Sequence, residues 1–113
     1  MRLDVYIENR RHPVEVPPEV LESARPLHEK MDRDMDAGWK MGPEFIERPD
    51  RVQRAQIAAS RLMLALEQGN ASLVQAMAGY ILSRIPGVRE VHVDTAGEPL
   101  NTALLGEGGR PVS

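Results

Sequence analysis

Hydrophobic and polar residues alternate over residues 1–16, apart from a polar turn near Asn9-Arg10-Arg11. The apolar positions of this segment are Leu3, Val5, Ile7, Val14 and Val16. Alternation with a period of two is typical of a strand that buries one face. We therefore predict a β-hairpin over residues 2–16, which ends at Pro17-Pro18 because proline lacks the N–H group that a ladder needs.

A second alternating run lies near the other end of the chain. Its apolar positions, Val91 and Val93, lie between polar neighbours and predict a last strand over about 89–94. A single strand must pair with another, and the first strand of the hairpin is the expected partner. The result is a small sheet of three strands, mostly antiparallel, whose apolar face meets the helices.

The first helix is expected to begin near Pro18, because proline is tolerated in the first turn of a helix. Pro26 lies farther along the same apolar pattern, where proline removes a hydrogen bond and clashes with the preceding turn. We therefore expect a kink or break at Pro26 and a main helical segment from there to about Lys40, before the stop signal Gly42-Pro43.

Two further helices are predicted before the last strand. The second helix runs from Pro49-Asp50 to about Gln68, and the third covers about 71–85. Gly69-Asn70 separates them, because glycine often follows a helix end and asparagine caps the next helix. One side of the third helix carries only small residues, namely Ser72, Ala76, Gly79 and Ser83. Small residues let backbones approach closely, and the alanines of the second helix are the expected neighbours.

These elements predict an α+β fold with an N-terminal β-hairpin, three helices and a C-terminal strand, in which a small three-stranded sheet packs against the helices. A chain of 113 residues suits a single domain, which we place at residues 1–95. From Ala96 onward, glycine, proline and weak patterning predict a flexible tail over 96–113.

One face of the first helix carries side chains that could bind a ligand. Its members are His28, Met31, Met35 and Trp39, and Asp32 lies four residues after the histidine. Imidazole and thioether groups are soft or borderline ligands, so the face suits Cu(I). It also suits a pocket for a small ligand, or a packed core in which Asp32 hydrogen-bonds His28. A buried pair of this kind also resembles a general base, and the sequence names no cofactor.

Polar side chains are expected on the outer face of the sheet. If the strands pair as predicted, this face brings together Asp4, Tyr6, Glu90, His92 and Asp94. Carboxylates beside a histidine can bind a divalent cation or act as acid and base. The solvated side of an ordinary sheet has the same composition, so both interpretations stay open.

The second helix carries an apolar stripe in addition to its core-facing one. Ile57 and Leu64 form this stripe, Ser60 and Arg61 flank it, and Leu82 of the third helix also projects away from its core face. A solvated helix face does not carry such a stripe. Either the second helix is sandwiched inside the monomer, or these residues form a subunit interface, for which a homodimer is the expected form.

Composition narrows the classes of function. The net charge is −3 and charges of both signs are interspersed, which argues against nucleic-acid binding. The absence of cysteine excludes disulfides and thiolate chemistry. The start of the chain lacks the apolar stretch of a signal peptide, and no run reaches the roughly 20 apolar residues of a membrane span. We therefore expect a cytoplasmic protein that binds neither nucleic acid nor membrane.

The expected function is that of a small accessory or interaction protein that self-associates through its helices and has no catalytic chemistry of its own. Arg48, Arg51, Arg54 and Arg61 suit a protein partner with carboxylates. The sequence contains none of the common nucleotide-binding, metalloprotease or hydrolase motifs. The alternative is a protein that binds a small ligand or a soft metal, or an enzyme, built on the face around His28.

Overall fold

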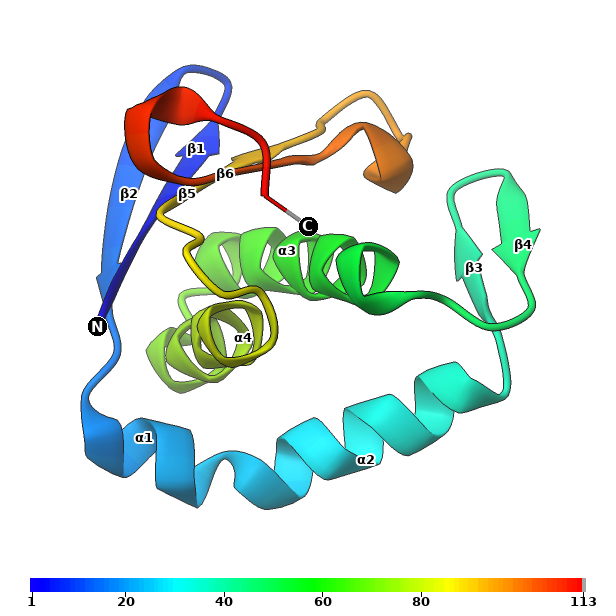
Figure 1. Cartoon of the computed structure of the whole chain (residues 1–113), viewed down its shortest axis with the longest axis horizontal. Coiled ribbons are helices and arrows are strands. Elements are labelled where there is room, and N and C mark those ends of the chain that lie inside the picture. The colour runs from blue at the N-terminus through cyan, green and yellow to red at the C-terminus, as the bar shows by residue number, and fades with distance from the viewer. Residues whose placement is uncertain (113) are drawn as a thin grey trace.

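The computed structural model describes residues 1–112 and has an α+β fold, in which helices pack against one face of a mixed sheet (Figure 1). The strand order is β2-β1-β5-β6, with β1 at Arg2–Ile7, β2 at Arg10–Glu15, β5 at Glu90–Val93 and β6 at Ala103–Leu105. β1 is antiparallel to β2 and parallel to β5, and β6 is antiparallel to β5. The predicted fold class and the pairing of β5 with β1 are confirmed, but the sheet has four strands instead of three.

The hairpin of β1 and β2 closes one residue earlier than predicted. Glu8 and Asn9 have φ angles of +51° and +67°, which identifies a two-residue turn of type I′. This turn fits the twist of the two strands. The sheet residues predicted to face the helices are buried, apart from Ile7, which is half-buried.

The first predicted helix is two helices, α1 (Pro18–Ser23) and α2 (Arg25–Asp36). The break falls at Ala24, so Pro26 lies in the first turn of α2, where its missing N–H leaves no bond unmade.

The end of α2 lies before the predicted end at Lys40. Gly38 has a φ of +101°, which stops the helix, and the chain continues as β3 (Trp39–Met41). β3 pairs with β4 (Glu44–Ile46) in a separate two-stranded sheet. The prediction that Trp39 shares a helix face with His28 is therefore wrong.

The two remaining helices follow their local signals closely. α3 spans Arg51–Glu67 and begins with a capping box between Asp50 and Gln53. α4 spans Ala71–Arg84, and the side chain of Asn70 accepts a hydrogen bond from the N–H of Leu73. No helix among residues 1–112 is both long and apolar enough to cross a membrane.

The segment after β5 contributes a strand and two short 3₁₀ turns, η1 (Pro99–Asn101) and η2 (Glu107–Gly109). Leu104 of β6 is 4% exposed, and Gln56 of α3 donates to the carbonyl oxygens of Leu100 and Thr102 at 2.9 and 3.0 Å. The mobility expected of 96–113 stays a prediction, and Ser113 lies outside the described residues.

The packing of β6 predicts a difference between two neighbouring leucines. Leu104→Ala should lower the free energy of unfolding by about 2–5 kcal/mol, because it leaves a cavity under a buried side chain. Leu105→Ala is the matched control, since Leu105 is half-buried on the other face of β6, and it should cost much less. Urea denaturation measures both losses. Small and equal losses would mean that residues 103–105 are mobile, as the sequence predicts.

Candidate functional site

His28 of α2 packs against the side of α4 that carries the small residues Ala76 and Gly79. Its side chain is 3% exposed, and Nε2 lies 2.8 Å from the carbonyl oxygen of Ala76. Because a carbonyl only accepts, Nε2 carries the proton. A Cβ at Gly79 would lie 3.2 Å from Leu21 and 3.7 Å from His28. The close approach at Gly79 thus comes from Val16, Leu21 and His28, and the expectation that it comes from the alanines of α3 is wrong.

Asp32 is the centre of a polar network that joins α2, α3 and α4. Its carboxylate accepts hydrogen bonds from the Tyr80 hydroxyl at 2.5 Å, from Arg84 Nη2 at 2.9 Å and from Arg54 Nη1 at 3.4 Å. Arg54 also donates to Asp36 at 2.6 Å. We call these residues the Asp32 network: Asp32, Asp36, Arg54, Tyr80 and Arg84. The hydrogen bond predicted between Asp32 and His28 is not among those formed by residues 1–112.

The environment fixes the protonation of three groups at neutral pH. Burial lowers the pKa of His28, so the imidazole is neutral. Burial alone would raise the pKa of Asp32, but hydrogen bonds from Tyr80 and Arg84 outweigh it and hold the pKa below its ordinary value. Burial and the Asp32 carboxylate raise the pKa of Tyr80, which stays a hydrogen-bond donor. His28 and Asp32 of α2 therefore do not form the hydrogen-bonded pair that a general base of this kind needs.

The methionines of the same helix face lie in the core. Met31 and Met35 are 3% and 1% exposed, whereas Trp39 is half-buried on β3. Within residues 1–112, no three His, Asp or Glu side chains gather in a way that could hold a metal ion. The Cu(I) hypothesis for His28, Met31 and Met35 stays a prediction, and the imidazole Nε2 is already hydrogen bonded.

The outer face of the sheet brings together four of the five residues predicted there. The rings of Tyr6 and His92 are stacked, with centroids 4.5 Å apart and planes 5° apart. His92 Nε2 lies 3.0 Å from the Glu90 carboxylate, and Asp4 forms ion pairs with the neighbouring Arg2 and Arg11. Asp94 instead accepts backbone hydrogen bonds from Ala96 and Glu98 in the turn after β5.

The residues predicted to form a helical interface separate into two groups. Ile57 and Leu82 are 3% and 7% exposed, so both lie inside the monomer. Leu64 is 52% exposed, and Ser60 and Arg61 beside it are half-buried. Self-association through the helices stays a prediction, for which Leu64 is the only strongly exposed apolar residue among those proposed.

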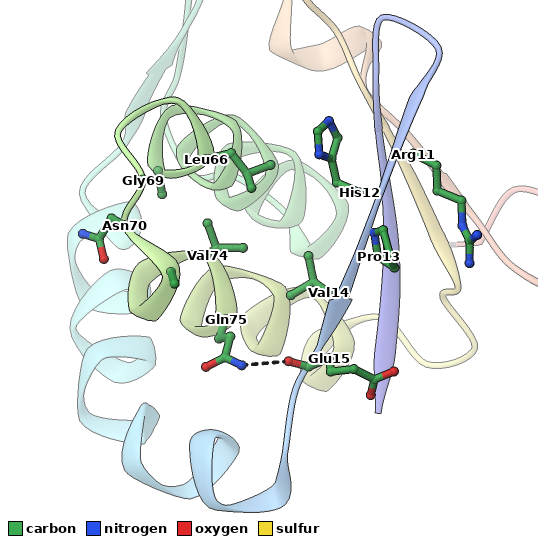
Figure 2. A pocket seen from close by; sticks show the side chains of 12 residues that line it. Arg11, His12, Pro13, Val14, Glu15, Leu66, Gly69, Asn70, Val74 and Gln75 are labelled. Atoms are coloured by element: carbon green, nitrogen blue, oxygen red, sulfur yellow. Dashed lines mark hydrogen bonds between the residues drawn. The ribbon is translucent and has the colours of Figure 1, made fainter.

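A groove that the sequence did not predict lies between β2 and the corner where α3 meets α4 (Figure 2). Its volume is about 530 Å³, and Figure 2 shows Val14 of β2 opposite Val74 of α4. Leu66 of α3 adds a third apolar side chain. We call it the β2 groove, and its lining residues are Arg11, His12, Pro13, Val14, Glu15, Ala65, Leu66, Gly69, Asn70, Ala71, Val74 and Gln75.

One wall of the β2 groove is the free edge of the sheet. Met1 and Val16 exchange backbone hydrogen bonds of 2.7 and 3.1 Å, so Val14, His12 and Arg10 likewise bond to β1. The residues that alternate with them point their backbone polar groups away from β1. These residues are Arg11, Pro13 and Glu15. The carbonyl oxygen of Glu15 accepts from the Gln75 side chain at 3.0 Å, the dashed line in Figure 2. Proline within an alternating run is the one sequence signal that indicates such an edge.

Comparison with known proteins gives no functional assignment. No model of a protein family matches this chain, and neither does a curated protein or a solved structure. The roles of its residues are therefore argued from their own geometry and chemistry.

The buried imidazole predicts a pH dependence of stability. The unfolded chain takes up a proton at His28 near its ordinary pKa of 6.5, whereas the native imidazole, with a lowered pKa, stays neutral. The contribution of His28 to stability is therefore fully present above pH 6.5 and is lost as the pH drops from 6.5 toward the native pKa. Urea denaturation between about pH 7.5 and about pH 5.5 measures this slope. His28→Gln should flatten it, and an unchanged slope would assign it to other groups.

Proposed function

We propose that this protein is a cytoplasmic interaction protein, without catalytic chemistry of its own, that binds an extended segment of a partner protein in the β2 groove. One observation carries the proposal. The groove lies between helices and an edge strand, and the outward N–H and C=O of Arg11 and the outward C=O of Pro13 have no backbone partner within residues 1–112.

Addition of a strand to a sheet edge is a common mode of peptide recognition. The backbone ladder supplies affinity, and side-chain pockets beside the edge supply specificity. Each net hydrogen bond is worth about 0.5–1.5 kcal/mol, so a short ladder needs additional apolar burial to bind well. The β2 groove provides both parts, because Val14, Leu66 and Val74 line it beside the edge. Its volume of about 530 Å³ lies in the range of ordinary ligand sites.

The chemistry of the groove indicates the kind of segment that fits. The side chains of Arg11 and Glu15 point away from the helices, and Arg11 pairs with Asp4 (Figure 2). The polar side chains on the helix side of the groove are those of His12, Asn70 and Gln75. A segment without net charge, with aliphatic side chains at alternate positions, matches this lining. Pro13 offers an acceptor and no donor, so the ladder has one gap at its middle.

The ladder can be tested at the amide of Arg11. A peptide selected from a library of random linear peptides on the intact protein should slow hydrogen exchange at this amide, because the N–H gains a partner. Arg11→Pro removes the donor but leaves the β1–β2 ladder intact, since this N–H faces outward. It should weaken binding about tenfold, which corresponds to about 1.4 kcal/mol. Arg11→Ala controls for the side chain and should bind like the wild type.

Equal binding by the proline and alanine variants, measured by fluorescence anisotropy, would contradict the ladder. A selection that gives no peptide whose binding protects Arg11 would contradict the proposal as a whole.

The apolar lining can be tested with two leucines of α3. Leu66→Glu places a carboxylate in the groove and should abolish peptide binding, because an unpaired charge is costly to bury. Leu64→Glu is the matched control, since Leu64 is 52% exposed and does not line the groove.

Sedimentation of the same variants tests the helical homodimer. A dimer that only Leu64→Glu disrupts would move the interaction surface to the exposed side of α3.

A further inference from the structure

A cavity of about 330 Å³ lies where α1 and the start of α2 face the end of α4. It shares no lining residue with the β2 groove, so it is a separate site that does not depend on peptide binding. Its volume lies within the range of small-ligand sites, near the lower end. We call it the α1–α4 cavity, and it is lined by Pro18, Leu21 and Glu22 of α1, Arg25 and His28 of α2, and Ser83 and Arg84 of α4.

His28 brings a hydrogen-bond acceptor to this cavity. Its Nε2 donates to the Ala76 carbonyl oxygen, so in the neutral ring Nδ1 is an acceptor. Nδ1 has no hydrogen-bond partner within residues 1–112. In this part of the chain, Gln56 Oε1 is the one side-chain nitrogen or oxygen that is both fully buried and unpartnered. Nδ1 is therefore unpartnered without being fully buried, which means that it faces an open space.

The contacts around the His28 ring indicate which space Nδ1 faces. Nε2 lies against Ala76, and Cε1 lies 3.7 Å from the position that a Cβ at Gly79 would take. Ala76, Gly79 and Ser83 follow one another on successive turns of α4, because residues three and four apart share a helix face. The next ring atom after Cε1 is Nδ1, which therefore lies toward Ser83. Since Ser83 and His28 both line the α1–α4 cavity, this cavity is the space that Nδ1 faces.

The charges of the lining indicate what kind of group fits. Glu22 and Arg25 carry opposite charges, and Arg84 is paired with the Asp32 carboxylate at 2.9 Å. With no excess of either charge, the cavity suits an uncharged ligand. The arginine side chains are donors, whereas Nδ1 is an acceptor. A hydroxyl group matches both, because its oxygen accepts and its hydrogen is donated.

We propose that the α1–α4 cavity binds a small uncharged molecule through a hydroxyl group that donates to His28 Nδ1. The apolar body of this molecule packs against Pro18 and Leu21. Largely buried polar atoms are normally hydrogen bonded, and the ligand supplies the donor that residues 1–112 do not supply to Nδ1. If the histidine is only a part of the core, no small molecule should bind there with a preference for a hydroxyl group.

The test titrates the full chain at neutral pH with two hydroxyl probes, phenol and cyclohexanol, and follows the amide and His28 ring nitrogens by NMR. Their methyl ethers, anisole and cyclohexyl methyl ether, keep the apolar body and the oxygen but lack the donor. At least one hydroxyl probe should give saturable shifts at Leu21, Ser83 and His28 Nδ1. Its ether should bind more weakly by about threefold or more, because one hydrogen bond is lost. Saturation by neither hydroxyl probe, or equal binding of a probe and its ether, would overturn the proposal.

Variants at both ends of α4 locate the binding site. Ser83→Leu should raise the Kd of the hydroxyl probe about tenfold or more, because the larger side chain takes up part of the cavity. Ser72→Leu is the matched control, since Ser72 is also exposed on α4 but does not line this cavity, and it should leave the Kd unchanged. Equal weakening by the two variants would overturn the proposal.

A variant of the histidine tests the acceptor itself. His28→Phe keeps a planar ring but removes Nδ1, so the hydroxyl probe and its ether should bind equally. A preference for the hydroxyl probe that persists in this variant would contradict the role of Nδ1. If His28→Phe fails to fold, the comparison of probe with ether in the wild type and the two serine variants decide the question.

Discussion

The parallel pairing of β1 with β5 governs the rest of the architecture. Parallel strands cannot be joined by a tight turn, so the chain between them must cross one face of the sheet. That connection contains β2 and every helix from α1 to α4, which is why the helices gather on one side (Figure 1). The four α-helices of residues 1–112 all belong to that connection, and the stacked Tyr6 and His92 lie on the opposite face of the sheet. β2 is left at an edge. The β2 groove follows from the same constraint, because α3 and α4 meet beside that edge.

Elements with local signals were predictable from the sequence. The capping residues Asp50 and Asn70 mark the starts of α3 and α4, and alternation over a few residues marks β1 and β5. β6 has only the residues Ala103–Leu105, too few for a periodic pattern, and it becomes a strand through its partner β5. The end of α2 had one local signal, Gly38, but the apolar spacing that continues to Trp39 is equally compatible with a helix.

The candidate sites could not be predicted in full from local patterns, because they depend on contacts between segments that lie far apart in the sequence. The helical spacing of His28 and Asp32 indicated a pair, yet Asp32 binds Tyr80 and Arg84 of α4, which lie far along the chain. Three donors satisfy this carboxylate better than one neutral imidazole does. His28 instead donates to the backbone carbonyl oxygen of Ala76. The periodicity of the sequence does not indicate which of several donors will bind the Asp32 carboxylate. The outer sheet face was predictable because strand parity alone decides which residues share it.

Pro13 affects how the exposed edge of β2 can pair, apart from the proposed peptide binding. An unpaired edge strand is a template with which a second copy of the same chain can pair. When one β2 meets another β2, each contributes a residue without a donor, and the ladder is interrupted from both sides. A foreign segment without proline loses only a single bond. Pro13 therefore makes pairing between two β2 edges less favourable than pairing of β2 with a strand that lacks proline.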